Sequence, residues 1–282
     1  MRTTAAATFC ATLVDEWVRR GVIDMVVAPG SRSTPLALAM IDHPDVRLHV
    51  HHDERSASFL ALGLGLATSR PAVMLTTSGT AAVECHPAVV EAHHAAVPLV
   101  VATADRPPEL WDVGAPQTID QTGLYGGAVR WFAEPGVPDD ATAAAWRPLA
   151  AEAVLRATRP TPGPVHLNLS FRDPLVGRAG PLPPPDPVGP AVPPASTGPS
   201  SADLDALAEA VGAARTGVIV AGVDAGPAAA VHGLASHLGW PVLAEPRSGC
   251  RFGPTAVAHA DGLLRVAPFA AARRPEVVLY LG

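Results

Sequence analysis

Apolar and polar residues alternate in two distinct patterns along the chain. In residues 4–20 the apolar side chains recur every three or four positions, which is typical of an amphipathic helix. This stripe consists of Phe9, Leu13, Val14 and Trp17. Residues 24–28 then form a short, largely apolar run, the pattern of a buried strand. The chain therefore opens with a helix followed by a strand.

The same alternation continues through the first part of the chain. The expected strands span residues 24–28, 47–51, 72–76, 98–103 and 164–169, and the expected helices span residues 35–40, 53–68, 80–95 and 141–157. Regular strand, loop and helix units of this kind predict a parallel sheet with helices on both faces, which is an α/β fold.

A proline-rich stretch separates this region from a second one. The 31 prolines are about twice the average usage, and many of them crowd between residues 181 and 199. We therefore predict a first domain at residues 1–178, a linker at residues 179–200 and a second domain at residues 201–282.

The second domain is expected to be a smaller α/β unit. Its expected helices are residues 201–214, with Ser201 or Asp203 as the cap, and 228–238; its expected strands are residues 217–221, 241–244 and 277–281. A buried parallel strand needs neighbours on both sides and helices on both faces. The short strand set therefore predicts an incomplete domain.

Charge and cysteine content exclude several classes of function. The formal net charge is −6, so we expect neither a nucleic-acid partner nor a membrane partner. Cys10, Cys85 and Cys250 are odd in number and far apart, which fits neither a disulfide framework nor a paired zinc site. Since the chain also lacks a signal-peptide pattern and a long apolar span, we predict a cytoplasmic protein.

Four polar segments lie where predicted strands end. They are residues 28–36 (APGSRSTPL), 51–57 (HHDERSA), 76–81 (TTSGTA) and 104–108 (ADRPP). In open α/β sheets, ligands bind outside the carboxyl ends of the strands. We therefore expect these segments to converge on one pocket.

Histidines near the second of these segments invite a metal interpretation. In an expected strand at residues 47–51, His49 and His51 share a face while His52 points away. Neither a cysteine nor a second histidine pair completes a site. Packing and hydrogen bonding are therefore the expected roles of these side chains.

At these segments the chain resembles the pyrimidine-binding domain of thiamine-diphosphate enzymes, and more narrowly the 2-succinyl-5-enolpyruvyl-6-hydroxy-3-cyclohexene-1-carboxylate synthases. Five segments carry the resemblance in order: PGSRSTPL, HDERSASFLALG, TTSGTAA, ADRPPEL and GAPQTIDQ. The resemblance implies an N-terminal pyrimidine-binding domain followed by an incomplete Rossmann-like central α/β domain. It also implies thiamine diphosphate with Mg²⁺ or Mn²⁺ as cofactors, and a homodimer or higher homo-oligomer whose active site lies between subunits.

The activity that the resemblance implies belongs to menaquinone biosynthesis. It is the decarboxylation of 2-oxoglutarate on thiamine diphosphate and the addition of a succinyl carbanion equivalent to isochorismate, with release of CO₂. Two alternatives stay open: another thiamine-dependent carboligase of the acetolactate-synthase type, and an inactive fragment or interaction domain. The SRSTPL and ADRPPEL segments argue against the first alternative.

Glu54 is the first candidate catalytic residue. In the resembling family, a glutamate at this motif position hydrogen-bonds N1′ of the aminopyrimidine and favours the tautomer whose 4′-nitrogen removes the thiazolium C2 proton. Taken alone, Glu54 could instead pair with Arg55 or cap the helix that starts near Asp53.

Cationic and polar loop residues are the candidate substrate ligands. Ser31 and Arg32 follow a Pro-Gly turn, and Arg106 precedes two prolines. Both substrates implied by the resemblance carry carboxylates, which a guanidinium can hold bidentately. Each arginine could instead lie at the surface or bond to loop carbonyls.

Two further sets complete the candidate site. Thr77, Ser78 and Gly79 form a strand-to-helix turn whose amides could touch the aminopyrimidine, or which could be a plain helix cap. Gln117 resembles the family's glutamine that faces the reacting intermediate, although a loop glutamine can equally be solvent-exposed.

The sequence lacks the expected motif for the diphosphate and its metal. Thiamine-diphosphate enzymes usually carry a Gly-Asp-Gly motif with an asparagine further on. The single Asp-Gly pair, Asp261–Gly262, lacks the preceding glycine and lies in a predicted loop. We therefore expect the metal ligands to be absent from this chain and the isolated chain to be inactive.

Overall fold

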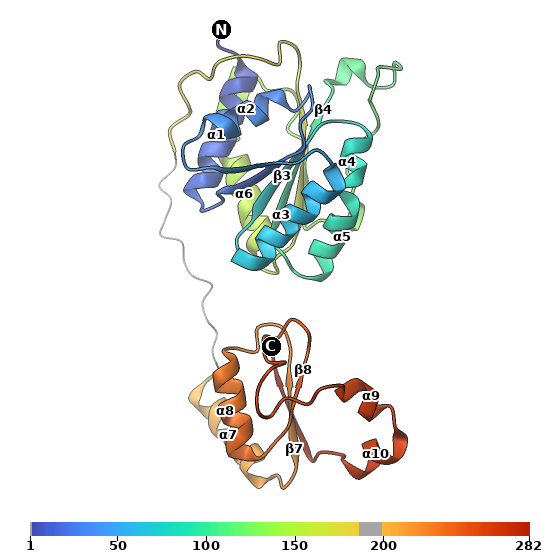
Figure 1. The fold of residues 1–282 in the computed structure, drawn as a ribbon. Helices are drawn as coiled ribbons and strands as arrows, with labels where there is room; N and C mark the ends of the chain where they lie inside the picture. The colour runs from blue at the N-terminus through green and yellow to red at the C-terminus, as the bar shows by residue number, and fades with distance from the viewer. Residues whose placement is uncertain (1, 186–198) are drawn as a thin grey trace. The chain divides into compact units, whose positions relative to one another are not determined.

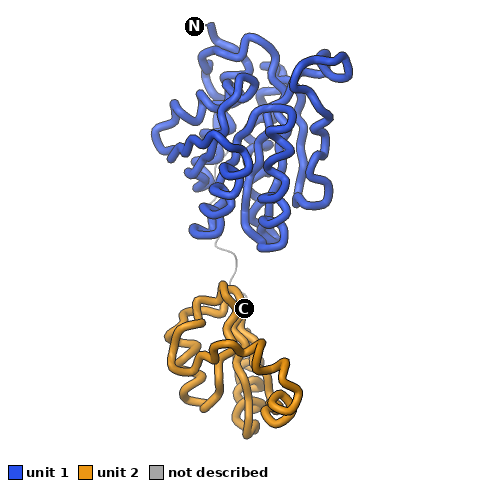
Figure 2. The backbone as a smooth tube through the Cα atoms, turned by 45° about the vertical axis from the view of Figure 1, so that its right-hand side comes forward, with its two compact units in different colours: residues 1–192 blue, residues 193–282 orange. Residues whose placement is uncertain are grey.

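The computed structural model describes residues 2–185 and 199–282 of the chain. They belong to two compact units, Met1–Val192 and Pro193–Gly282 (Figure 2). Each unit is built on its own parallel sheet (Figure 1).

The first unit contains a six-stranded parallel sheet with the strand order β2-β1-β3-β4-β6-β5. Its strands are β1 (Asp24–Val27), β2 (Arg47–Val50), β3 (Ala72–Thr76), β4 (Leu99–Asp105), β5 (Trp131–Ala133) and β6 (Pro164–Ser170). All strand pairings in this sheet among the described residues are parallel. The predicted α/β fold with a parallel sheet is therefore confirmed.

Helices cover both faces of this sheet. They are α1 (Ala5–Arg19), α2 (Thr34–Asp42), α3 (Glu54–Thr68), α4 (Thr80–Glu84), α5 (His86–His94) and α6 (Trp146–Thr158), with short 3₁₀ turns at Pro108–Leu110, Gly126–Ala128 and Asp140–Ala145. The helices α1, α2 and α6 pack on one face, and α3, α4 and α5 pack on the other (Figure 1). Adjacent residues of β3 show this division, because Met74 joins the second cluster and Leu75 the first, and both are fully buried. Burial on both faces is why the inner strands β1, β3 and β4 are largely apolar, whereas the edge strands β2 and β5 are less buried.

The predicted helix at residues 80–95 is two helices. The chain forms α4 and α5 with the break at Cys85. Pro87 has no backbone N–H to donate to the carbonyl of Val83, so this helical hydrogen bond is missing and the helix is interrupted between the two residues. The prediction of one continuous helix was therefore wrong at this point.

The region before β6 also differs from the expectation. The predicted helix at residues 141–157 begins as a 3₁₀ turn, capped by the Asp139 side chain, and becomes α-helical only at Trp146. Pro148 lies in the first turn of α6, where its missing N–H costs no helical bond. The three-residue strand β5 at the sheet edge was not predicted, because it is too short to show a periodic pattern.

The second unit has a three-stranded parallel sheet with the order β8-β7-β9. Its elements are α7 (Ser201–Ala213), β7 (Gly217–Ala221), α8 (Ala228–Leu238), β8 (Val242–Ala244), α9 (Ala260–Leu264), α10 (Ala267–Ala272) and β9 (Val277–Leu281). The predicted strands and the two longer helices are confirmed to within a residue at each end.

Two local predictions in this unit were wrong. The cap of α7 is Ser200, which forms a capping box with Asp203, rather than Ser201 or Asp203. Asp261 and Gly262 lie in the short helix α9, not in a loop. The first error concerns a helix start, where side-chain hydrogen bonds decide the boundary. The second concerns a five-residue helix, which is too short to show a periodic pattern.

The three-stranded sheet is packed mainly on one face. Val231 and Ala235 of α8 lie in its buried cluster. On β9, Val278 and Tyr280 are each 57% exposed, and Val278 borders a cavity of about 630 Å³. The second sheet therefore keeps an open apolar face among the described residues, unlike the first.

Most of the predicted linker, residues 186–198, lies outside the described residues. Its first residues contact the first unit: the Gly180 N–H donates to Thr8 Oγ1 at 2.9 Å, and the Pro183 carbonyl accepts from Arg147 Nε at 2.7 Å. The predicted boundaries at residues 178 and 200 remain predictions.

Candidate active site

The four polar segments lie at one edge of the six-stranded sheet. β1, β2, β3 and β4 end at Val27, Val50, Thr76 and Asp105. Because the strands are parallel and pair in register, their carboxyl ends share an edge. The fold therefore brings together the predicted site segments from residues that are distant in sequence.

Glu54 is the first residue of α3, and it does not cap that helix. The cap is Asp53, whose Oδ1 accepts a hydrogen bond from the Ser56 N–H at 2.7 Å. The Glu54 side chain is half-buried. In the described part of the chain, its carboxylate has neither a hydrogen bond nor an ion pair with Arg55 or any other residue. Neither ordinary role therefore occupies Glu54, and its carboxylate is available to a ligand.

Two glycines allow the loops of this edge to touch. A Cβ on Gly30 would lie 2.4 Å from Thr77 Cβ, so the loop after β1 rests directly against the turn after β3. Gly79 has φ +81°, and a Cβ there would lie 2.9 Å from Gln117 Cγ. Gly79 needs both a left-handed backbone and the absence of a side chain, which only glycine provides, whereas Gly30 needs only the absence of a side chain.

Ser78 forms hydrogen bonds with two other predicted site residues, Arg106 and Gln117. It is fully buried. Its Oγ accepts a hydrogen bond from Arg106 Nη1, and its carbonyl accepts one from Gln117 Nε2 at 2.9 Å. Gln117 is exposed but has φ +57°, so its backbone is held in the left-handed region. The turn after β3 therefore positions both Arg106 and Gln117.

Arg32 is held in the loop after β1, and its buried Nε–H has no partner among the described residues. Its Nη1 donates to the Phe171 carbonyl at 2.8 Å and lies 3.7 Å from Asp173 Oδ2. Its side chain is 11% exposed, and its buried Nε has no partner among the described residues. The loop-carbonyl interpretation is therefore correct for one nitrogen, while the Nε–H remains for a ligand.

The two arginines create a positive region at this edge. Burial lowers the pKa of Arg106, and the charge of Arg32 lowers it further. The neighbouring Arg32 charge makes ionisation of Arg106 more costly, and an anion beside Arg106 would relieve that cost. The region is therefore suited to a carboxylate.

Ser31 and Thr77 flank the same loops. Ser31 is exposed at the turn before α2, and Thr77 is 7% exposed beneath Gly30. Thus Thr77, Ser78, Gly79, Arg106 and Gln117 form one contact group. Ser31, Arg32 and Glu54 lie at the carboxyl-terminal edge of the same sheet, and in the described chain they form neither a hydrogen bond nor an ion pair with that group.

A buried network of polar side chains supports this edge, and the sequence analysis did not identify it. Its members are Thr103, Asp105, Gln121, Glu134 and Asn168. Asn168 Nδ2 donates to Asp105 Oδ2 at 2.9 Å and to Glu134 Oε1 at 2.5 Å. Its Oδ1 accepts from Thr103 Oγ1 at 2.9 Å and from Gln121 Nε2 at 2.8 Å. Asparagine in an apolar strand was the available signal, because a buried amide requires partners.

The network ends at the predicted site. Gln121 Oε1 accepts from the Gly79 N–H at 2.8 Å, and Asp105 Oδ1 accepts from the Arg106 N–H at 2.7 Å. Burial raises the pKa of the Asp105 carboxyl. We name these five side chains the amide network.

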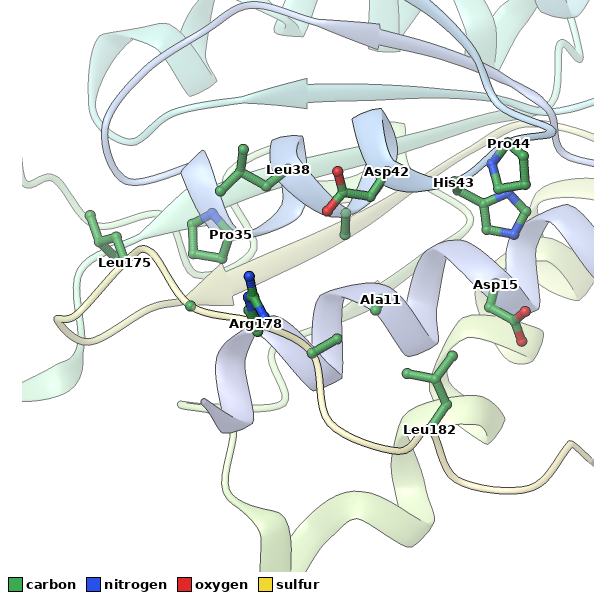
Figure 3. Close-up of a pocket in the computed structure, with 14 residues that line it drawn as sticks. Ala11, Asp15, Pro35, Leu38, Asp42, His43, Pro44, Leu175, Arg178 and Leu182 are labelled. Atoms are coloured by element: carbon green, nitrogen blue, oxygen red, sulfur yellow. The ribbon is translucent and has the colours of Figure 1, made fainter. Parts of the chain in front are cut away.

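The described part of the first unit contains, among its cavities, two that no predicted site residue lines. One of about 200 Å³ lies against the network, lined by Asp105, Gln121 and the loop between them. The other, about 620 Å³, lies between α1, α2 and residues 175–182, with Pro35, Leu38 and Arg178 around it (Figure 3). No predicted site residue lines the larger cavity.

The described residues fit one end of a thiamine cofactor and not the other. The uncommitted Glu54 carboxylate and the glycine turns suit an aminopyrimidine. In contrast, no group of three His, Cys, Asp or Glu side chains within residues 2–185 and 199–282 could hold a metal ion. Among the histidines considered above, His49 Nε2 lies 3.4 Å from Asp24 Oδ1. Within these same ranges, none of the helices has the length and apolar character needed to cross a bilayer.

Comparisons with known proteins point the same way. Residues 7–124 match the family model "Thiamine pyrophosphate enzyme, N-terminal TPP binding domain". Three relatives are each called 2-succinyl-5-enolpyruvyl-6-hydroxy-3-cyclohexene-1-carboxylate synthase. The one from Chloroflexus aurantiacus is 47% identical, covering 96% of this chain and 48% of the relative. The one from Thermobifida fusca is 48% identical, covering 96% and 49%. The one from Geobacillus kaustophilus is 43% identical, covering 99% and 50%.

The chain spans about half the length of the curated relatives it matches. Within that half, the family model covers α1 to the loop after β4, which includes every predicted site residue. The chain belongs to the thiamine-diphosphate enzymes and, within them, to the 2-succinyl-5-enolpyruvyl-6-hydroxy-3-cyclohexene-1-carboxylate synthase family.

Proposed function

We propose that this chain supplies the pyrimidine-binding half of a thiamine-diphosphate-dependent transferase of menaquinone biosynthesis. The enzyme would decarboxylate 2-oxoglutarate and transfer the remaining succinyl unit to isochorismate, with release of CO₂. The observation that carries the proposal is the uncommitted Glu54 carboxylate beside a turn, Thr77 to Gly79, that ties down Arg106 and Gln117. The names of the relatives support the choice of substrates.

Thiamine diphosphate, when bound, would provide the acidic carbon that adds to the 2-oxo group. Glu54 would hold a proton at N1′ of the aminopyrimidine, because its half-buried carboxylate has no other partner among the described residues. The backbone of the Thr77–Gly79 turn would contact the ring, and Gly30 and Gly79 would permit its close approach. These roles are confined to holding the ring and one proton.

Arg32 and Arg106 would bind the carboxylates of the two substrates. Each lies at the positive region of the edge, and Arg32 keeps a buried Nε–H without a partner in the described chain. Ser31 and Gln117 would add neutral hydrogen bonds beside them. A carboxylate held by two charge-assisted bonds is oriented as well as attracted.

The diphosphate and its Mg²⁺ or Mn²⁺ ion are proposed to be bound by residues other than these. The described side chains do not assemble a ligand set, and the sequence has no Gly-Asp-Gly motif. We therefore propose that the isolated chain does not turn over. The enzyme that contains it is proposed to be cytoplasmic, with neither a nucleic acid nor a membrane as partner.

The active enzyme is proposed to be a homodimer or a higher homo-oligomer. Helices α3 and α4, which carry or follow site residues, expose large apolar side chains. Phe59 is 42% exposed, Leu60 37%, Leu66 50% and Val83 40%. We name these four residues the α3 face. An apolar surface next to a functional carboxylate suits a subunit contact that encloses the cofactor.

A substrate panel on the complete enzyme tests the proposal. Product should form from 2-oxoglutarate with isochorismate, and Arg32→Ala and Arg106→Ala should each raise KM for the carboxylate substrates by about tenfold or more. A preference for pyruvate would instead favour the acetolactate-synthase-type alternative. The exposed Asp112→Asn variant is the control, because this side chain touches none of the site residues.

Calorimetry on the isolated chain tests the fragment interpretation. Thiamine diphosphate with Mg²⁺ should bind weakly or not at all, and no product should appear. Turnover by the isolated chain would contradict this part of the proposal.

A further inference from the structure

The amide network is the most completely bonded polar cluster at the predicted site edge, and its role is not explained by ligand contact. Thr103, Asp105, Gln121 and Asn168 are each at most 1% exposed. They come from β4, β6 and the loop that follows β4. Asp105 and Gln121 border the cavity of about 200 Å³, but their polar atoms already hold hydrogen bonds within the chain. The functional role considered for these side chains therefore acts through the backbone they hold.

Hydrogen-bond chemistry fixes the direction of the network. Asp105 and Glu134 can only accept when ionised, so the Asn168 amide must point its NH₂ group toward them. Its oxygen then accepts from Gln121 Nε2, whose second proton goes to the Ala104 carbonyl at 3.2 Å. If the Gln121 amide were flipped, its Nε2 would face the Gly79 N–H, and its Oε1 would face Asn168 Oδ1 and the Ala104 carbonyl oxygen. One orientation therefore satisfies every group.

The free end of this chain of bonds is the Gln121 oxygen, which holds the Gly79 N–H. Gly79 has ψ −142° with its positive φ, a conformation that glycine adopts freely and other residues avoid. A glycine backbone can also take other conformations, so the hydrogen bond from its N–H to Gln121 restricts the turn. Ser78 precedes it and binds Arg106 through its hydroxyl and Gln117 through its carbonyl. The position of two proposed substrate ligands thus depends on one buried amide.

We propose that Gln121 and Asn168 are positioning residues that set the Ser78–Gly79 turn and, through it, Arg106 and Gln117. This proposal deepens the proposed function and rests on it for the roles of Arg106 and Gln117. The geometric claim itself, that the buried amides hold the turn, concerns the ligand-free chain.

Amide hydrogen exchange on the isolated chain tests the geometric claim without cofactor or substrate. Gln121→Glu and Asn168→Asp keep the shape of each side chain but remove donors. Each should speed exchange in residues 76–82 and 106–122 by about tenfold or more, because the network loses bonds at buried acceptors. Exchange in α1 should be unchanged. Asp112→Asn, in the same loop but exposed, is the matched control.

Acidification provides a rescue that a general loss of stability does not predict. Protonating the carboxyl introduced by Gln121→Glu restores one donor toward Asn168, so protection of the turn should return as pH falls. The groups facing it are Asp105 on β4, Glu134 after β5, Arg106, and His166 on β6, whose pKa burial lowers to about 3. Wild-type exchange, corrected for intrinsic rate at each pH, supplies the reference for their titration.

Two outcomes would overturn the proposal. One is wild-type exchange of both segments in both variants. The other is equal acceleration of α1 and the two segments, without recovery in acid, which would make the network a general stabilising element. If the exchange result holds while the enzyme fails to use thiamine diphosphate, the proposed function is wrong and the positioning claim stands.

Discussion

The two sides of the predicted site edge differ in how far the chain itself completes them. On one side, the amide network satisfies every polar group it contains, and four of its five side chains, all but Glu134, are at most 1% exposed. On the other, Glu54 is half-buried without a bonding partner among the described residues, and it lies near the exposed apolar side chains of the α3 face. The first side is therefore built for stability and position. The second side is built to be completed by something that binds.

The largest expected stability effect is on the network side. Asn168→Leu would leave the Asp105 and Glu134 carboxylates without their amide donor. Breaking a buried charged hydrogen-bond set in this way should lower the free energy of unfolding of the first unit by about 3–5 kcal/mol. Glu54→Gln should change it by less than about 0.5 kcal/mol, because the Glu54 carboxylate has no hydrogen bond or ion pair to lose among the described residues. Native-state hydrogen exchange of β3 measures both, and equal effects would erase the comparison.

Substitutions in the α3 face should mainly weaken association of subunits and should have little effect on folding stability. Phe59→Ser and Leu66→Ser should weaken self-association of the complete enzyme by about tenfold or more, since their side chains are exposed in the chain alone. The buried neighbour Leu62, 8% exposed, is the control: Leu62→Ala should cost about 2–5 kcal/mol of folding stability. Sedimentation velocity separates the two effects. Unchanged association in both serine variants would argue against the α3 face as the interface.

The smallest expected effect is on the pH dependence of stability. Burial raises the pKa of Asp105 above its ordinary value of 3.8. Between the ordinary pKa of the unfolded state and the raised pKa of the folded state, the folded protein binds more protons than the unfolded protein. The free energy of unfolding therefore falls as pH rises through this window. Asp105→Asn should flatten this slope, and Asp112→Asn should leave it unchanged. A slope that persists without Asp105 would assign it to another group.

Local sequence patterns were sufficient for the fold and for the location of the site. Apolar runs buried on both faces, such as Met74 and Leu75 in β3, identify parallel strands. Motifs at strand ends then place the loops at one edge. The sequence failed where a partner far along the chain decides the outcome. Gln121 and Asn168 are 47 residues apart, and neither shows a local pattern, because the bond that gives each its role forms only after the sheet assembles.

Smaller errors have a local origin. The Pro87 break follows from a known rule and could have been predicted, whereas the capping box at Ser200 depends on which of two adjacent serines faces Asp203. For Arg32, the sequence left a loop-carbonyl role and a ligand role as alternatives. The structure assigns Nη1 to the Phe171 carbonyl and leaves Nε unpartnered among the described residues, so both alternatives are compatible with its geometry.

The rate at which the cofactor's C2 proton exchanges with solvent is the most direct test of the central claim, that Glu54 activates thiamine diphosphate. The measurement is made by NMR on the complete enzyme in D₂O without substrate, for the wild type and for Glu54→Gln. The account predicts that the substitution slows exchange by about 100-fold or more, while bound cofactor and folding stability are retained. Exchange at the wild-type rate in Glu54→Gln with cofactor bound would contradict it.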